Sequence, residues 1–366
     1  MLTILTLFLP SYSGPLSIPI RYFSLPFFFN IRVAYKNSFL FALSAFLFFI
    51  YIFLASFFER KLNLIDVSFI LALIFTCYII NFFYKKQDLL HKLIKYFFIV
   101  NVAYAFLQNV FLNLGVDSHL LLFHQNTHQV GYFIPKSFIP YIYRVTGLFN
   151  ESVPFVLYLM YTYIYFSYYK NGFLKKLAFL SILLSGSKIA LAFIVILFLI
   201  YPFKKIKLYW LIYISFALFV CLFVYYNSVM VAYLLDNPVL YSIYLRGEGL
   251  FSVMQELSNN SEALWFGAGN ISSKDMMDGM MKVNRSTDII SLMIYSNGII
   301  GTLLINIPIF VYFKIIKMNV EVPVLNLVSV SITLTFIVTG AYTFWGYMYL
   351  VVILSTFSSS YTKHSI

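Results

Sequence analysis

The sequence predicts an all-α, polytopic integral membrane protein, and three observations predict this class. Of the 366 residues, 61% are hydrophobic and only 10% are charged, whereas soluble proteins carry roughly 25% charged residues. The mean hydropathy is +0.87. The apolar residues form solid runs close to the roughly 20 residues that one bilayer crossing requires, and a helix satisfies its own backbone polar groups in lipid. We therefore expect one transmembrane unit over 1–366, with roughly 10–12 crossings.

Most spans are expected to coincide with single apolar runs. In chain order these are Ser38–Leu54, Ile65–Tyr84, Tyr96–Leu114, Pro154–Tyr169, Leu208–Tyr226, Ile289–Phe313, Val322–Thr339 and Ala341–Thr356. Lysines gather between the runs, and basic residues between spans favour the cytoplasmic side. The groups are Lys85/Lys86/Lys92/Lys95, Lys170/Lys175/Lys176, Lys204/Lys205/Lys207 and Lys314/Lys317. This placement accounts for the net charge of +12 as a topology signal, so we expect no nucleic-acid partner.

The segment 177–201 is treated separately because lysines flank it on both sides. If both lysine groups are cytoplasmic, the chain crosses an even number of times between them. Ser185-Gly186-Ser187-Lys188 lies near the middle, as a turn between two short helices would. We expect a transmembrane helical hairpin whose tip carries Lys188 toward an outward water-filled cavity. The competing interpretation is one long tilted span with Lys188 buried in it, which would place a costly lone charge inside the bilayer.

If all these lysine groups are cytoplasmic, successive spans cross the membrane in alternating directions. Two loops then face outward, a shorter one at 115–152 and a long polar one at 226–287. The long loop carries Arg246, Arg285 and a turn at Gly267 and Gly269 whose backbone N–H groups could help hold an anion. Arginine binds phosphate oxygens with a planar fork, so Arg246 and Arg285 could grip phosphates together with Lys188. The alternative is a solvated loop whose charges keep it in water.

The shorter loop ends with Arg144 and Glu151, just before Pro154. Glu151 either stabilises the start of the next helix or serves as an interfacial carboxylate that accepts a proton from a sugar hydroxyl. His124 and His128 have the i,i+4 spacing of metal ligands, but no recognised spacing ties a third ligand to them. We therefore predict no metal site and no cofactor.

Six motifs follow one another along about half of the chain. They are Arg144-x-x-Gly147-x-x-x-Glu151-Ser-x-Pro154, Ser185-Gly-Ser-Lys188, Arg246, Phe266-Gly-x-Gly269, Ser286-Thr-Asp288 and Gly298-Ile-Ile-Gly301. Their order resembles the bacterial O-antigen polymerase and ligase superfamily, integral inner-membrane glycosyltransferases with a large periplasmic loop. Each motif is weak alone, and the ordered set is moderately specific.

The resemblance implies substrates that are oligosaccharide repeat units on undecaprenyl diphosphate, polymerised at the periplasmic face of the inner membrane. It implies diphosphate binding by Lys188 and Arg246, and it adds Arg144 and Arg285 as candidates. Either Glu151 or Asp288 would activate the acceptor hydroxyl. Membrane lipid and a polysaccharide chain-length regulator are the other expected partners.

The chain departs from the family pattern in two ways. Lysine stands at position 188, where the family usually has arginine, so the charge is kept but the fork is lost. Ligases carry a histidine just before the span that follows the long loop, and here Arg285 to Asp288 contain none. This favours an O-antigen polymerase, with an O-antigen ligase or a non-enzymatic polysaccharide flippase or transporter as the alternatives.

Overall fold

The computed structural model describes residues 39–58, 64–84, 86–121, 134, 137, 140–149, 152–200, 261–267, 289–338, 352–354 and 356–357. The helices there are α2 (Phe39–Ala55), η3 (Ser56–Phe58), α3 (Leu64–Tyr84), α4 (Gln87–Asn113), α5 (Ser118–Leu121), α6 (Ser152–Tyr168), α7 (Gly172–Leu184), α8 (Lys188–Ile200), α12 (Ser261–Phe266), α14 (Ile289–Asn319) and α15 (Val322–Val338). No β-strand occurs in these ranges, so the all-α prediction is confirmed for this part of the chain.

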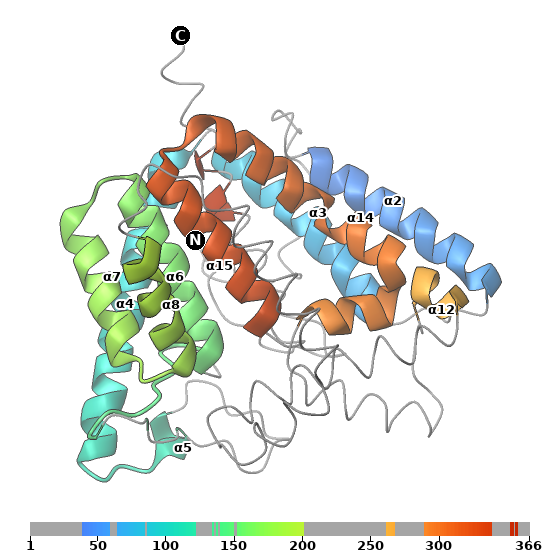
Figure 1. The fold of residues 1–366 in the computed structure, drawn as a ribbon. Coiled ribbons are helices and arrows are strands. Elements are labelled where there is room, and N and C mark those ends of the chain that lie inside the picture. The colour runs from blue at the N-terminus through green and yellow to red at the C-terminus, as the bar shows by residue number, and fades with distance from the viewer. Residues whose placement is uncertain are drawn as a thin grey trace.

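Helix α6 is the centre of the larger helix group. It is buried along nearly its whole length, and Tyr158, Tyr161 and Tyr165 are among its fully enclosed side chains. A helix that is apolar on every side is stable only when other elements cover it. Helices α4, α7, α8 and α15 provide that cover (Figure 1).

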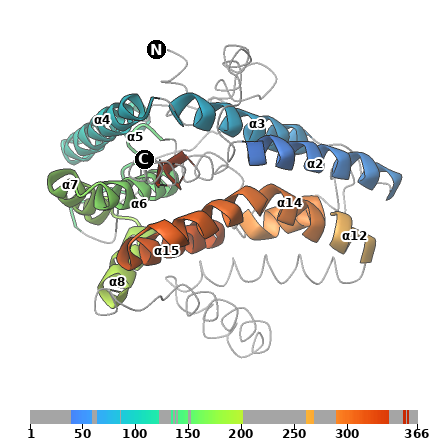
Figure 2. The same cartoon turned by 90° about the horizontal axis from the view of Figure 1, so that it is seen from above.

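Helices α2, α3 and α14 form a second group, and α15 lies between the two groups (Figure 2). The α2–α14 contact has its own apolar cluster, which includes Phe48 and Tyr51 from α2 and Met293 and Ile305 from α14. The short helix α12 packs against α14, on the side of the molecule away from α7 and α8 (Figures 1 and 2).

The segment expected to be a hairpin forms two helices, α7 and α8, separated at Ser185–Ser187. Helix α7 begins at Gly172 rather than at Leu177. The Asn171 side chain caps it by accepting a hydrogen bond from Leu174 N at 3.2 Å. Lys175 fits in the first turn because its ammonium group lies over the Tyr163 ring, 5.5 Å from the centroid.

Helix α4 also begins earlier than the sequence predicts, at Gln87 instead of Tyr96. Lys92 and Lys95 therefore lie on the helix rather than before it. Both are exposed, while Leu90 and Ile94 are buried. This part of α4 is amphipathic, with lysines on one face and apolar residues on the other. Average hydropathy does not predict a helix over such a charged stretch.

Helix α14 is not the continuous span expected over Ile289–Phe313, because the backbone breaks at Gly298 (φ 61°, ψ −174°). Asn306 Nδ2 donates a hydrogen bond to Met293 Sδ at 3.6 Å, although the two residues are 13 positions apart. In a straight helix they would be ~20 Å apart along the axis. The first part of α14 therefore folds back on the second part.

Among the described residues, two helices are long and apolar enough to cross a membrane by length and composition, Gln87–Asn113 and Met293–Val311. The second contains the break at Gly298, so it is not one straight rod. Shorter apolar helices are Phe39–Ala55, Phe69–Phe83, Ile189–Phe198 and Val322–Ile332. The predicted spans Leu208–Tyr226 and most of Ala341–Thr356 lie outside the described residues.

Candidate functional site

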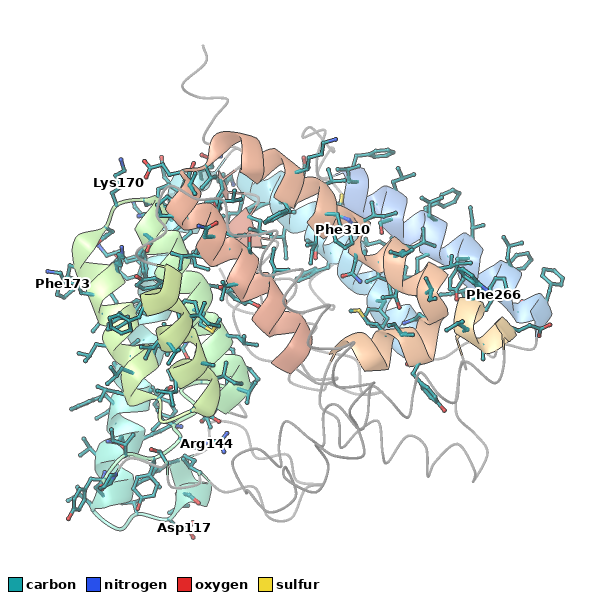
Figure 3. All side chains as sticks on the ribbon, in the orientation of Figure 1. Asp117, Arg144, Lys170, Phe173, Phe266 and Phe310 are labelled. Atoms are coloured by element: carbon teal, nitrogen blue, oxygen red, sulfur yellow. The ribbon has the colours of Figure 1, made fainter. Side chains whose placement is uncertain are left out.

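Arg144 lies where the shorter predicted loop meets the first turn of α6. Its Nη2 donates to Ser152 Oγ at 3.2 Å, and Ser152 is the first residue of α6. Figure 3 shows Arg144 at one end of the helix group, with Lys170 at the opposite end. At that opposite end Lys170 Nζ is 3.6 Å from a Glu321 carboxylate oxygen, and both side chains are exposed.

Amide side chains of α4 hold the irregular backbone around Arg144. Gln108 Oε1 accepts from the backbone N–H groups of Thr146 at 3.1 Å and Gly147 at 2.9 Å, and Asn101 Oδ1 accepts from Leu148 N at 3.0 Å. Both amides are fully buried. Non-helical backbone buried in protein needs partners of this kind, because no water is there to replace them.

Asn109, directly after Gln108, and Asn113, one turn further along α4, bind the same segment. Asn109 Oδ1 accepts from Tyr143 N, and Asn113 Nδ2 donates to Tyr141 O, each at 3.0 Å. Nothing predicted these hydrogen bonds between α4 amides and the Arg144 segment. Their signal was present as four amides, at positions 101, 108, 109 and 113, in the otherwise apolar stretch from Tyr96 to Asn113.

The turn between α7 and α8 packs directly on the segment that leads to Arg144. A Cβ on Gly186 would lie 2.5 Å from Ser137 Cβ and 3.3 Å from Ile142 Cγ2, and the residue has φ +64°. Ser185 and Ser187 are buried as well. The three turn residues are thus covered by protein. Lys188 is the first residue of α8, and because its side chain is not described, the expected water-filled cavity around it stays a prediction.

A second cluster forms where Gly267 meets the break in α14. A Cβ on Gly267 would lie 2.6 Å from Gly298 N, and a Cβ on Gly298 would lie 2.6 Å from Gly267 N. Both glycines have positive φ, +82° and +61°. No other residue type fits either position without moving the backbone. Two motifs that are 31 positions apart in the sequence, Phe266-Gly267 and Gly298-Ile-Ile-Gly301, therefore meet in the fold.

Tyr51 of α2 completes this second cluster. Its hydroxyl lies 2.6 Å from both the Phe266 and the Asn297 carbonyl oxygens. A Cβ on Gly301 would lie 2.7 Å from Tyr51 Cε1. Nothing in the sequence pattern marked Tyr51, which lies inside an apolar run.

The predicted site residues therefore occupy different places. The segment that leads to Arg144 contacts the turn before Lys188, whereas Gly267 lies across the molecule with α12 (Figures 1 and 2). Glu151, Arg246, Gly269, Arg285 and Asp288 lie outside the described residues, as do His124 and His128. Within the described ranges no three His, Cys, Asp or Glu side chains are grouped as metal ligands would be.

Comparison with known proteins gives no match to a protein-family model, to a curated protein or to a solved structure.

Proposed function

We propose that this chain is a polytopic inner-membrane glycosyltransferase of the O-antigen polymerase type. One observation carries most weight: Ser137 and Ile142, in the segment that leads to Arg144, pack on Gly186 in the α7–α8 turn. Arg144 and Lys188 each belong to one of the ordered sequence motifs. A cationic site assembled from separate elements suits a diphosphate, whose charge needs more than one cation.

Membrane insertion is supported by the large apolar side chains that the fold leaves on its surface. Phe46 and Phe53 on α2 are 60% and 61% exposed, and Phe106 on α4 is 64% exposed. Exposed apolar faces of this extent are costly in water and suit a lipid surface. We propose that these faces contact acyl chains.

The proposed sidedness is supported by the distribution of charge. Lys170, Lys175 and Lys176 lie at or next to the α6–α7 turn, the end of the molecule opposite Arg144 (Figure 3). Basic residues favour the cytoplasmic side. The Arg144 end would then face the periplasm, the side on which the sequence also predicts the long loop 226–287.

The proposed reaction transfers a glycan chain from undecaprenyl diphosphate to a sugar hydroxyl of a second lipid-linked repeat unit. The bond between the anomeric carbon and the diphosphate oxygen breaks, and a bond from that carbon to the acceptor oxygen forms. Glu151 or Asp288 accepts the hydroxyl proton. Lys188, Arg246 and Arg285 stabilise the charge that develops on the departing diphosphate, with Arg144 beside them. The chain's own cations supply this charge, so the proposal invokes no cofactor.

A deletion strain tests the reaction class through a gel of its surface polysaccharide. A polymerase predicts a single-repeat glycan in place of the ladder of long chains. A ligase predicts polymer that accumulates on the lipid carrier, and a flippase predicts repeat units that never reach the outer face. An unchanged ladder would refute the proposal.

The interrupted helix α14 favours a transporter or flippase as the second candidate. Transporters bind their substrates where membrane helices are discontinuous. In this chain, however, the break at Gly298 is filled by α12, since Gly267 lies against it. The backbone at the break contacts protein rather than lining a space, and for this reason we place the polymerase first.

A further inference from the structure

Tyr51 is positioned to hold two helix ends together. Phe266 is the last residue of α12, so its carbonyl lies at the C-terminal end of that helix. Asn297 directly precedes the break at Gly298 in α14. The Tyr51 hydroxyl lies 2.6 Å from the carbonyl oxygen of each residue, and its single proton serves both.

The Tyr51 ring fixes the hydroxyl in this place. It stacks on Phe266 with centroids 6.3 Å apart and on Phe48 at 5.8 Å. Gly301 leaves room for the ring edge, since a Cβ there would lie 2.7 Å from Tyr51 Cε1. The side chain is only 5% exposed. Water therefore cannot replace the hydroxyl at low cost.

We propose that Tyr51 is a positioning residue for the long outer loop. Helix α12 is a described part of that loop, and in the sequence it lies between Arg246 and Arg285. A loop anchored at α12 has a smaller range of positions for the residues on either side, so less ordering is required when the diphosphate binds. The role in binding rests on the proposed function, whereas the anchoring of α12 does not.

The test replaces Tyr51 by phenylalanine, which keeps the stacked ring and removes only the hydroxyl. A cysteine at the partly buried position 263, A263C, reports the opening of α12 when Cys77 and Cys221 are replaced by alanine. We expect Y51F to raise the rate of thiol labelling from outside spheroplasts about three- to tenfold, the change that the loss of one buried hydrogen bond gives. We also expect cells with Y51F to make shorter glycan chains, although the amount of inserted protein is unchanged. Chain length should increase again when lipid-linked repeat units are overproduced.

Tyr104→Phe is the matched control. Tyr104 OH donates to Leu121 O at 2.9 Å, and Gln108 Nε2 also donates to that carbonyl, so it keeps a partner when the hydroxyl is removed. Labelling at position 263 and chain length should both stay at the wild-type level in Y104F.

The outcomes separate this inference from the proposed function. Unchanged labelling in Y51F would overturn the anchoring of α12. Faster labelling with unchanged glycan, in a cell whose deletion strain does lose long chains, would overturn the role of Tyr51 in substrate positioning. Faster labelling in a protein whose deletion leaves the glycan unchanged would refute the polymerase and leave the anchor standing.

Discussion

Gly267 and Gly298 lie so close that a Cβ on either would stand 2.6 Å from the backbone nitrogen of the other. The contact joins the end of α12 to the break in α14, and both residues adopt positive φ. It is the point where a segment of the predicted long loop is fixed to the helix group.

Alanine at either glycine should destabilise the protein strongly. The substitution adds a collision with backbone to the strain of a positive φ, and together these should cost about 3 kcal/mol or more. Thermal unfolding in detergent, followed by the fraction that remains monodisperse, measures the effect. Gly172→Ala is the control, because a Cβ there meets nothing within 4 Å. A Gly298→Ala variant as stable as G172A would show that the contact is not tight.

Ser44 and Pro308 should be energetically coupled. Proline has no N–H, so Pro308 leaves the Leu304 carbonyl without its helical donor, and Ser44 Oγ donates to that carbonyl instead. Ser44→Ala should cost about 1–2 kcal/mol in the native chain. The cost should fall by about 1 kcal/mol in a Pro308→Ala background, where residue 308 supplies its own N–H. A double-mutant cycle of unfolding free energies gives the coupling energy. A coupling energy near zero would show that Ser44 does not replace the donor that Pro308 lacks.

Gln108→Leu should release the Arg144 segment. The substitution leaves the buried N–H groups of Thr146 and Gly147 without an acceptor, at a cost of about 3 kcal/mol. Proteolysis between residues 140 and 150, compared with that of the wild type, should be faster in this variant. The matched control is Asn113→Ala, whose hydrogen bond to Tyr141 O is exposed and should contribute less than about 0.5 kcal/mol. Equal proteolysis of the two variants would contradict the assigned role of Gln108.

Arg144→Ala should abolish long glycan chains under the proposed function. Loss of a group that stabilises developing charge reduces a rate by about 10²–10³-fold. Arg144→Lys should retain part of the activity because the charge stays and the fork is lost. Lys170→Ala, at the opposite end of the molecule, removes only an exposed ion pair and should leave the ladder unchanged. The ladder and the level of inserted protein are read from the same cells. A wild-type ladder from R144A would remove Arg144 from the mechanism.

The boundaries of the helices that coincide with single apolar runs were predicted closely. Helices α2, α3, α6 and α15 begin and end within two residues of the expected Ser38–Leu54, Ile65–Tyr84, Pro154–Tyr169 and Val322–Thr339. The reason is that charged or polar residues and turn formers bound each run. The boundary of α4 was wrong, because its first turns are amphipathic and hydropathy counts the exposed Lys92 and Lys95 against a helix.

Hydropathy alone did not reveal the break in α14, because the polar Ser296-Asn297-Gly298 stretch lies between two apolar stretches that together are long enough for one span. The glycine itself was noted only as part of a motif. Its backbone conformation depends on α12, which occupies the space that a continuous helix would close. The hydrogen-bond partners of the α4 amides could not be predicted either, because they too are set by contacts between distant parts of the chain. Gln108 bonds to residues 38 and 39 positions away, and no local pattern specifies that pairing.

The sequence by itself therefore determined the helical class and the position of most helices, because the transfer of apolar side chains out of water depends on composition and run length. It also placed a turn at Ser185–Ser187. Only the tertiary structure decided that Ser137 and Ile142, just before Arg144, pack on this turn and that Gly267 meets Gly298. Those contacts join residues distant in the chain, and they depend on steric fit and on which buried carbonyl or N–H still needs a partner.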